Sequence, residues 1–135
     1  MAYWMLKSEP HAYSWQQLMA DGKTNWDGVR NHQATNNLRA MQVGDQGFFY
    51  HSNQGLAIVG VVDIIGTAIP DPSDASGRFV MVIVAPQRPL ANPVTLAMLK
   101  TEPALSALAM LRQPRLSVSP ITSAEWQIIE QLAKG

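Results

Sequence analysis

Six consecutive residues between two predicted helices carry the chemistry needed to bind a flat, polar ligand. From Trp26 to Asn31 the chain contains an indole, a carboxylate, a glycine, a guanidinium and an amide. An indole ring provides a surface for stacking, and carboxylate and amide groups hydrogen-bond to the edge of a heterocycle. A second, purely structural interpretation buries Trp26 and pairs Asp27 with Arg30. In that interpretation Asn31 caps the next helix.

Three other polar segments each lie next to a predicted apolar strand. They are Lys7-Ser8-Glu9, His51-Ser52, and the stretch from Arg112 to Ser117, which contains Arg115. Taken singly, each is an ordinary strand exit or a solvated basic loop. If the segments converge at one end of a curled sheet, they form the kind of site that binds small ligands and oligonucleotides. We therefore interpret the segment after Trp26 as one wall of a binding site.

Hydrophobic periodicity and capping residues predict the elements that must position these segments. Strands are expected over residues 3–7, 46–51, 56–68 and 78–85, with a short extended piece at 116–119. Helices are expected from Ser14 to Gly22, over 31–41, after Thr95 and after Thr122. Ser14 with Gln17, and Thr122 with Glu125, have the spacing of capping boxes.

These elements predict a single α+β domain over residues 1–135. We expect a strongly bent, mostly antiparallel β-barrel of about five strands, with helices inserted between strands one and two and after strand four. Gly60 and Gly66 lie inside the third long strand, where they permit the bulges that curl a small sheet. A C-terminal helix completes the fold.

The composition narrows the function. The chain has no cysteine, and His11, His32 and His51 lack metal-site spacing, so we expect no metal and no cofactor. Ten basic residues balance ten acidic ones, so a bound nucleic acid should touch the protein through few phosphates. The early apolar run, Met1 to Leu6, is too short for a signal peptide, and we expect a monomer in the cytoplasm that spans no membrane.

Two other functions use the same residues. Asp27, His51 and Ser52 could form a hydrolase triad if the segments meet. Adjacent residues of a strand point to opposite faces, however, and the chain has no nucleophile elbow, so we expect no enzyme. The pocket could also take a nucleoside-like small molecule or a protein partner without any polymer, which the balanced charge allows.

Six segments together resemble the EVE domain family, and they occur in the family's order along nearly the whole chain. These segments are residues 3–10, 24–31, 36–39, 44–45 with 48–52, 70–72, and Arg112 with 116–118. The resemblance implies a PUA-like β-barrel related to the YTH domains that read methylated adenine in RNA. It also implies that a modified nucleobase of DNA or RNA inserts into a pocket at the end of the barrel.

The resemblance also implies roles for individual residues. Trp26 with Asp27 takes the place of the aromatic cage residue and its neighbour. The expected pocket comprises Lys7, Ser8, Glu9, Trp26, Asp27, Val29, Asn31, His51, Ser52 and Ser117, and the expected phosphate contacts are Arg30, Arg112 and Arg115. Two positions depart from the family pattern: His32, where a Tyr is usual, would alter the pocket floor, and Thr35, where a basic residue is common, would remove a phosphate contact.

Overall fold

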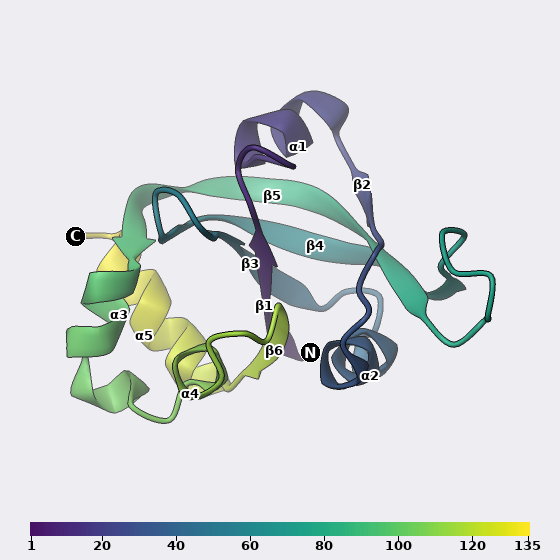
Figure 1. The fold of residues 1–135 in the computed structure, drawn as a ribbon. Helices are drawn as coiled ribbons and strands as arrows, with labels where there is room; N and C mark the ends of the chain where they lie inside the picture. The colour runs from purple at the N-terminus through teal and green to yellow at the C-terminus, as the bar shows by residue number, and fades with distance from the viewer.

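Six strands form one mixed sheet in the order β2-β5-β4-β3-β1-β6 (Figure 1). The computed structural model describes the whole chain, from Met1 to Gly135. The strands are β1 (Tyr3–Ser8), β2 (Thr24–Trp26), β3 (Gln46–His51), β4 (Ala57–Pro70), β5 (Val80–Thr95) and β6 (Val118–Ile121). Neighbouring strands are antiparallel except β1 and β3, which run parallel. The first strand therefore lies inside the sheet, between β3 and β6.

Five α-helices and one short 3-10 turn surround the sheet. They are α1 (Trp15–Asp21), α2 (His32–Ala40), α3 (Leu96–Thr101), η1 (Pro103–Leu105), α4 (Ala109–Arg112) and α5 (Ser123–Ala133). Figure 1 shows α3, α4 and α5 gathered at one end of the molecule, away from α1 and α2. None of the helices has the length and apolar character needed to cross a membrane.

The predicted helix caps are present. The Ser14, Asn31 and Thr95 side chains each accept a hydrogen bond from a backbone N–H in the first turn of α1, α2 and α3. Thr122 and Glu125 form the complete reciprocal box at the start of α5. The box predicted at Ser14 is only half formed. The Ser14 hydroxyl accepts the Gln17 N–H, but the Gln17 side chain bonds Asp21 through its Nε2 and does not accept the Ser14 N–H.

A hydrophobic cluster packs on each face of the sheet. Successive side chains of a strand point to opposite sides, so one strand contributes to both clusters. On β3, Phe48 packs with α5, where its ring stacks on that of Trp126 at 3.8 Å. The next residue, Phe49, faces the other cluster, which α1 and α2 cover. The buried face of α2 is a thin apolar stripe, formed by Ala34 and Leu38 and continued by Met41 at the C-cap.

Irregular pairing between β4 and β5 occurs at both predicted glycines. The register shifts next to Gly60 and on both sides of Gly66, and it shifts once more between Val61 and Val62. Gly60 also lies directly beneath the Trp15 ring of α1, and a Cβ atom at this position would be 2.4 Å from that ring. The absence of a side chain at Gly60 therefore lets α1 pack onto the curved sheet.

The sequence prediction was wrong in three respects. It missed β2, whose three residues pair with β5. It ended β5 at residue 85, whereas the strand continues to Thr95 through Pro86, Pro89 and Pro93. The prolines fit because β2 pairs with β5 only as far as Val84, which leaves that side of the strand without a partner. Finally, β2 and β6 do not pair, so the barrel is not closed.

Substituting Gly60→Ala tests the close approach of α1 to the sheet. We expect the free energy of unfolding to fall by about 1 to 3 kcal/mol, because the new methyl group overlaps the Trp15 ring. Urea denaturation measures this loss. Gly66→Ala is the matched control, since its Cβ atom would meet only the Ile83 side chain, at 3.1 Å. Equal losses for the two variants would show that Trp15 does not constrain position 60.

Candidate functional site

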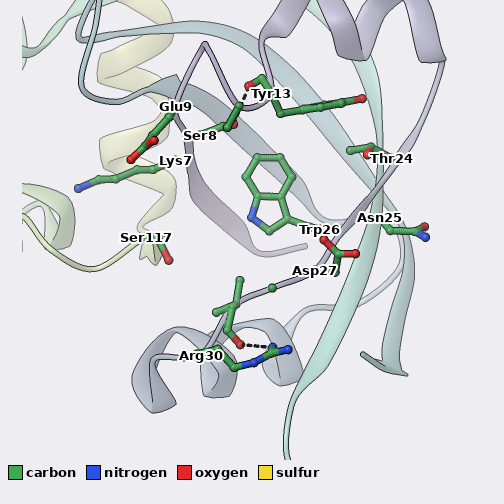
Figure 2. A pocket seen from close by; sticks show the side chains of 13 residues that line it. Lys7, Ser8, Glu9, Tyr13, Thr24, Asn25, Trp26, Asp27, Arg30 and Ser117 are labelled. Atoms are coloured by element: carbon green, nitrogen blue, oxygen red, sulfur yellow. Dashed lines mark hydrogen bonds between the residues drawn. The ribbon is translucent and has the colours of Figure 1, made fainter. Parts of the chain in front are cut away.

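A cavity of about 520 Å³ lies between the end of β1, the start of α1 and the segment that follows β2. Figure 2 shows the Trp26 indole standing among the side chains of these segments, with Tyr13 on one side and Lys7, Glu9 and Ser117 on another. Thirteen residues line the cavity: Lys7, Ser8, Glu9, Ala12, Tyr13, Thr24, Asn25, Trp26, Asp27, Gly28, Val29, Arg30 and Ser117. The structure thus brings together two of the four polar segments and one residue of a third.

Trp26 is held by the sheet rather than by a loop. It is the last residue of β2, and its ring meets that of Phe49 edge-on, with 5.6 Å between the centroids. The side chain is partly buried, and its indole N–H donates no hydrogen bond within the protein. The aromatic surface is therefore fixed in position, while its hydrogen-bond donor remains available to a ligand.

The segment after Trp26 is fastened by a buried carboxylate. Asp71 accepts hydrogen bonds from the Gly28 N–H at 2.8 Å and from Arg30 Nη1 at 3.0 Å. The Ser73 N–H and hydroxyl occupy its other oxygen, at 2.8 and 2.6 Å. Burial by itself would raise the pKa of Asp71, but hydrogen bonds from Ser73, Gly28 and Arg30 hold it well below its usual range. Asp71 therefore stays ionised and positions the cavity wall.

The expected ion pair between Asp27 and Arg30 is absent. Arg30 pairs with Asp71, donates to the Ser73 hydroxyl, and lies over the Phe79 ring at 5.0 Å. The Arg30 guanidinium is thus bonded within the protein, where the fully buried Asp71 carboxylate accepts from it. Asp27 is exposed and makes no hydrogen bond, so its carboxylate is available to the cavity.

The opposite wall comes from the end of β1. Lys7 Nζ donates to the Pro114 carbonyl at 2.7 Å, and burial lowers the pKa of its ammonium. The backbone N–H of Lys7 donates to the Ser117 carbonyl, which links this wall to the segment before β6. The Ser8 hydroxyl donates to the Tyr13 carbonyl at 2.6 Å. These hydrogen bonds fix the rim of the cavity. The Ser8 hydroxyl donates its proton in one of them, and its lone pairs remain free to accept a hydrogen bond.

Five residues expected at the site lie outside this cavity. Asn31 caps α2, and it lines a separate open hollow together with Arg115. Arg112 lies at the end of α4, where its Nε donates to the Ser106 carbonyl. The remaining two, His51 and Ser52, also point elsewhere.

His51 and Ser52 do not form a triad with Asp27. His51 Nε2 accepts the Trp15 N–H at 3.1 Å, and burial lowers the pKa of the imidazole. His51 therefore anchors the start of α1 as a neutral acceptor. Ser52 lines a second cavity, and no hydrogen bond joins any two of the three residues.

The two departures from the family pattern also lie away from the cavity. His32 is exposed on α2, where its ring stacks on Phe79 with 5.5 Å between centroids, so it does not form a pocket floor. Thr35 is completely buried, and its hydroxyl has no partner. Position 35 therefore faces the core of this protein, and the expectation of a lost phosphate contact there is wrong.

Comparison with known proteins identifies the family. The model of the EVE domain matches residues 2–132. The chain belongs to the EVE domain family. Thymocyte nuclear protein 1 of Rattus norvegicus is 35% identical, over 98% of this chain and 74% of its own length. The fold of this EVE domain is PUA-like, with the open sheet described above.

Solved structures of other proteins superpose over almost the whole EVE domain. A solution structure of Rpa0253 from Rhodopseudomonas palustris is 48% identical with a TM-score of 0.95, and the match covers 99% of this chain and 94% of that one. Human THYN1, solved in complex with 5-methylcytosine-containing DNA, is 31% identical with a TM-score of 0.93, and the match covers 100% and 99%.

Sequence reasoning missed several residues of the EVE domain cavity. Tyr13, Thr24 and Asn25 line it, but none of them was among the pocket residues expected from the sequence. Their proximity depends on β2 pairing with β5, and three residues give too short a pattern to predict a strand. Asp71 was also overlooked as a positioning residue, although Asp-Pro-Ser is a typical turn sequence in which the aspartate bonds its own backbone.

Substituting Asp71→Asn tests how the cavity wall is held. We expect the free energy of unfolding at pH 7 to fall by about 1.5 to 3 kcal/mol, the range for hydrogen bonds to a charged group. Hydrogen exchange should also accelerate at the backbone amides of Gly28 and Ser73, which donate to Asp71. Chemical denaturation and exchange mass spectrometry measure the two effects. Asp27→Asn is the control, because Asp27 makes no hydrogen bond, and it should change neither quantity.

The same pair of variants has a pH signature. The pKa of Asp71 is lower in the folded state than in the unfolded chain, so its contribution to stability is present above about pH 4 and is lost as the pH falls below that value. The wild type and Asp27→Asn should show this loss, and Asp71→Asn should lack it. An identical acid dependence for all three proteins would contradict the assigned role.

Proposed function

We propose that this EVE domain binds nucleic acid that contains a modified base and holds that base in the cavity around Trp26. The observation that carries the proposal is the fixed indole in a cavity of about 520 Å³ with polar walls (Figure 2). That volume lies within the range of ligand pockets, about 300 to 1,000 Å³. The human relative in complex with 5-methylcytosine-containing DNA supports the same ligand class.

Stacking supplies the first part of the binding energy. A base stacked on an aromatic side chain gains about 1 to 3 kcal/mol. Because Phe49 already holds the Trp26 ring edge-on, little side-chain entropy is lost when a base arrives. Turning the base out of a duplex costs a few kcal/mol, and less from single-stranded or mismatched substrate. Stacking alone therefore offsets only part of this cost.

Polar groups around Trp26 supply the second part. The Asp27 carboxylate is an acceptor for an exocyclic amino group. The Thr24 hydroxyl, which can both donate and accept, lies on the same face of β2 as Trp26. These two groups can recognise both donors and acceptors on the edge of one base.

Few cations are available to the phosphates. Arg30 is engaged by Asp71, so we assign it to positioning the cavity wall rather than to phosphate binding. Arg112 and Arg115 remain exposed beside the segment that leads to Ser117, and we propose that they contact flanking phosphates. Binding that depends on two or three cations should weaken only gradually with salt.

The geometry favours a binding protein over an enzyme. Asp27, His51 and Ser52 lie apart, and His51 is occupied by the backbone of α1. No three side chains of the His, Asp and Glu types gather into a metal-binding group. We therefore propose recognition without chemical conversion of the base.

Substituting Trp26→Ala should abolish the preference for the modified base. We expect a loss of about 1 to 3 kcal/mol in binding to an oligonucleotide with one 5-methylcytosine, because the stacking surface is removed. Fluorescence anisotropy with modified and unmodified single and double strands measures the preference. Trp26→Phe, which keeps a ring, should retain part of it. Equal affinity of the wild-type protein for modified and unmodified strands would refute the proposed function.

Substituting Arg115→Ala should weaken modified and unmodified strands by the same factor. A phosphate contact carries no information about the base, and its removal should lower the slope of log affinity against log salt by about 0.7 for a single strand. The anisotropy titration repeated at several salt concentrations gives that slope. Arg88→Ala, on β5 outside the proposed interface, is the control. A loss confined to the modified strand would place Arg115 at the base instead.

A further inference from the structure

A second cavity, of about 330 Å³, adjoins the base cavity. It lies beyond Lys7, between the end of β3, the turn that follows it, and helices α3 and α4. Lys7 is the one residue that lines both cavities. Ser52, which the sequence placed beside the base, lines this second cavity instead. The two hollows therefore share a cationic wall.

The second cavity has the charge of an anion site. Its ten lining residues include Lys7 and Lys100 and no acid, whereas the base cavity contains both Glu9 and Asp27. The Lys7 ammonium has three donors, and the Pro114 carbonyl uses one of them. Burial lowers the pKa of this ammonium, and an anion beside it would offset the cost of keeping it charged.

Tyr50 adds a hydrogen-bonding group to the same wall. It is only 3% exposed, it lines the second cavity, and its hydroxyl makes no hydrogen bond within the protein. Its ring lies 5.9 Å from Lys7 Nζ. Burial raises the pKa of Tyr50, so the hydroxyl keeps its proton and can donate to an acceptor. The hydroxyl is not fully buried, so it opens onto the cavity and can donate to a ligand there.

Apart from Ser52 and Asn53, the remaining lining is apolar. Leu96, Met110 and Leu111 contribute side chains from α3 and α4, and Leu56 contributes an exposed one from the turn before β4. A cavity with one cationic, hydrogen-bonding wall and one apolar wall suits a ligand with a phosphate on one side and a ring on the other. A nucleotide has this chemistry.

We propose that the second cavity holds the nucleotide next to the modified one, with the phosphate between the two nucleotides on Lys7. Tyr50 then donates to this neighbouring nucleotide, and Lys100 contacts the phosphate that follows it. The inference rests on the proposed function, because it takes the modified base to be in the cavity around Trp26. It makes the recognised unit a short strand rather than a single base.

Binding of short probes to the wild-type protein tests the inference. The probes are 5-methyl-2′-deoxycytidine, its 5′- and 3′-monophosphates, and two trinucleotides that carry two thymidines on either the 5′ or the 3′ side. The trinucleotide whose thymidines extend toward the second cavity should bind about tenfold more tightly than the monophosphate with its phosphate on the same side. This factor is the effect of one further charge-assisted contact. In nuclear magnetic resonance spectra, the backbone amides of Asn53 and Leu111 should shift with that trinucleotide and not with the nucleoside.

A matched pair of variants locates the contact. Lys100→Gln should remove most of the trinucleotide's advantage over the monophosphate and leave nucleoside binding unchanged. Lys134→Gln, which removes an exposed lysine at the far end of α5, should change neither. Lys100 is exposed, so its replacement should not disturb folding.

The outcomes separate the two proposals. Trinucleotides that bind no more tightly than the monophosphates, or that leave the amides of Asn53 and Leu111 unshifted, overturn the second cavity's role while the base cavity stands. Equal effects of Lys100→Gln and Lys134→Gln also overturn it. Failure of the wild-type protein to bind any probe, the nucleoside included, removes the base cavity and the inference together.

Discussion

The edge-on packing of aromatic rings on Phe49 is the constraint from which the site is built. Phe49 is fully buried on β3 and meets the rings of Trp15 and Trp26 at 5.5 and 5.6 Å. Its partner across the strands is Gly60, and the absence of a side chain there lets Trp15 reach Phe49. One cluster of rings thus fixes how α1 packs on the curved sheet and how Trp26 is oriented. The loop that follows Trp26 runs from this cluster to Asp71, which accepts the Gly28 N–H.

The two cavities that meet at Lys7 differ in the charged side chains that line them. On one side lie an indole and carboxylates, which suit the edge of an uncharged heterocycle. On the other lie lysines without an acid, which suit phosphate. The chain has no net charge, so this local separation replaces the uniform positive field of many nucleic-acid-binding proteins. In the proposed function, selectivity then comes from the base, because general attraction to the backbone is weak.

The sequence predicted the elements whose signals are local. Capping side chains and apolar spacing located α1, α2 and α5, and Gly60 and Gly66 located the bulges. Non-local pairings were beyond such signals. The strand β2 has three residues, β5 runs through prolines, and the Asp71–Arg30 pair joins positions 41 residues apart. The sequence therefore predicted that the segments at Lys7 and Trp26 come together, which the cavity shows. The position of Ser52 in a different cavity required the structure.

The position of β1 between β3 and the edge strand β6 has a consequence for folding during synthesis. This strand lies between β3 and β6, so its two neighbours come from residues 46–51 and 118–121. The cavity wall at Lys7 depends in the same way on the carbonyl of Ser117. Because a ribosome releases the chain from the N-terminus onward, a nascent chain shorter than about 120 residues lacks both β6 and this wall. The wall of the cavity at Lys7 is therefore complete only when the last strand has joined the sheet.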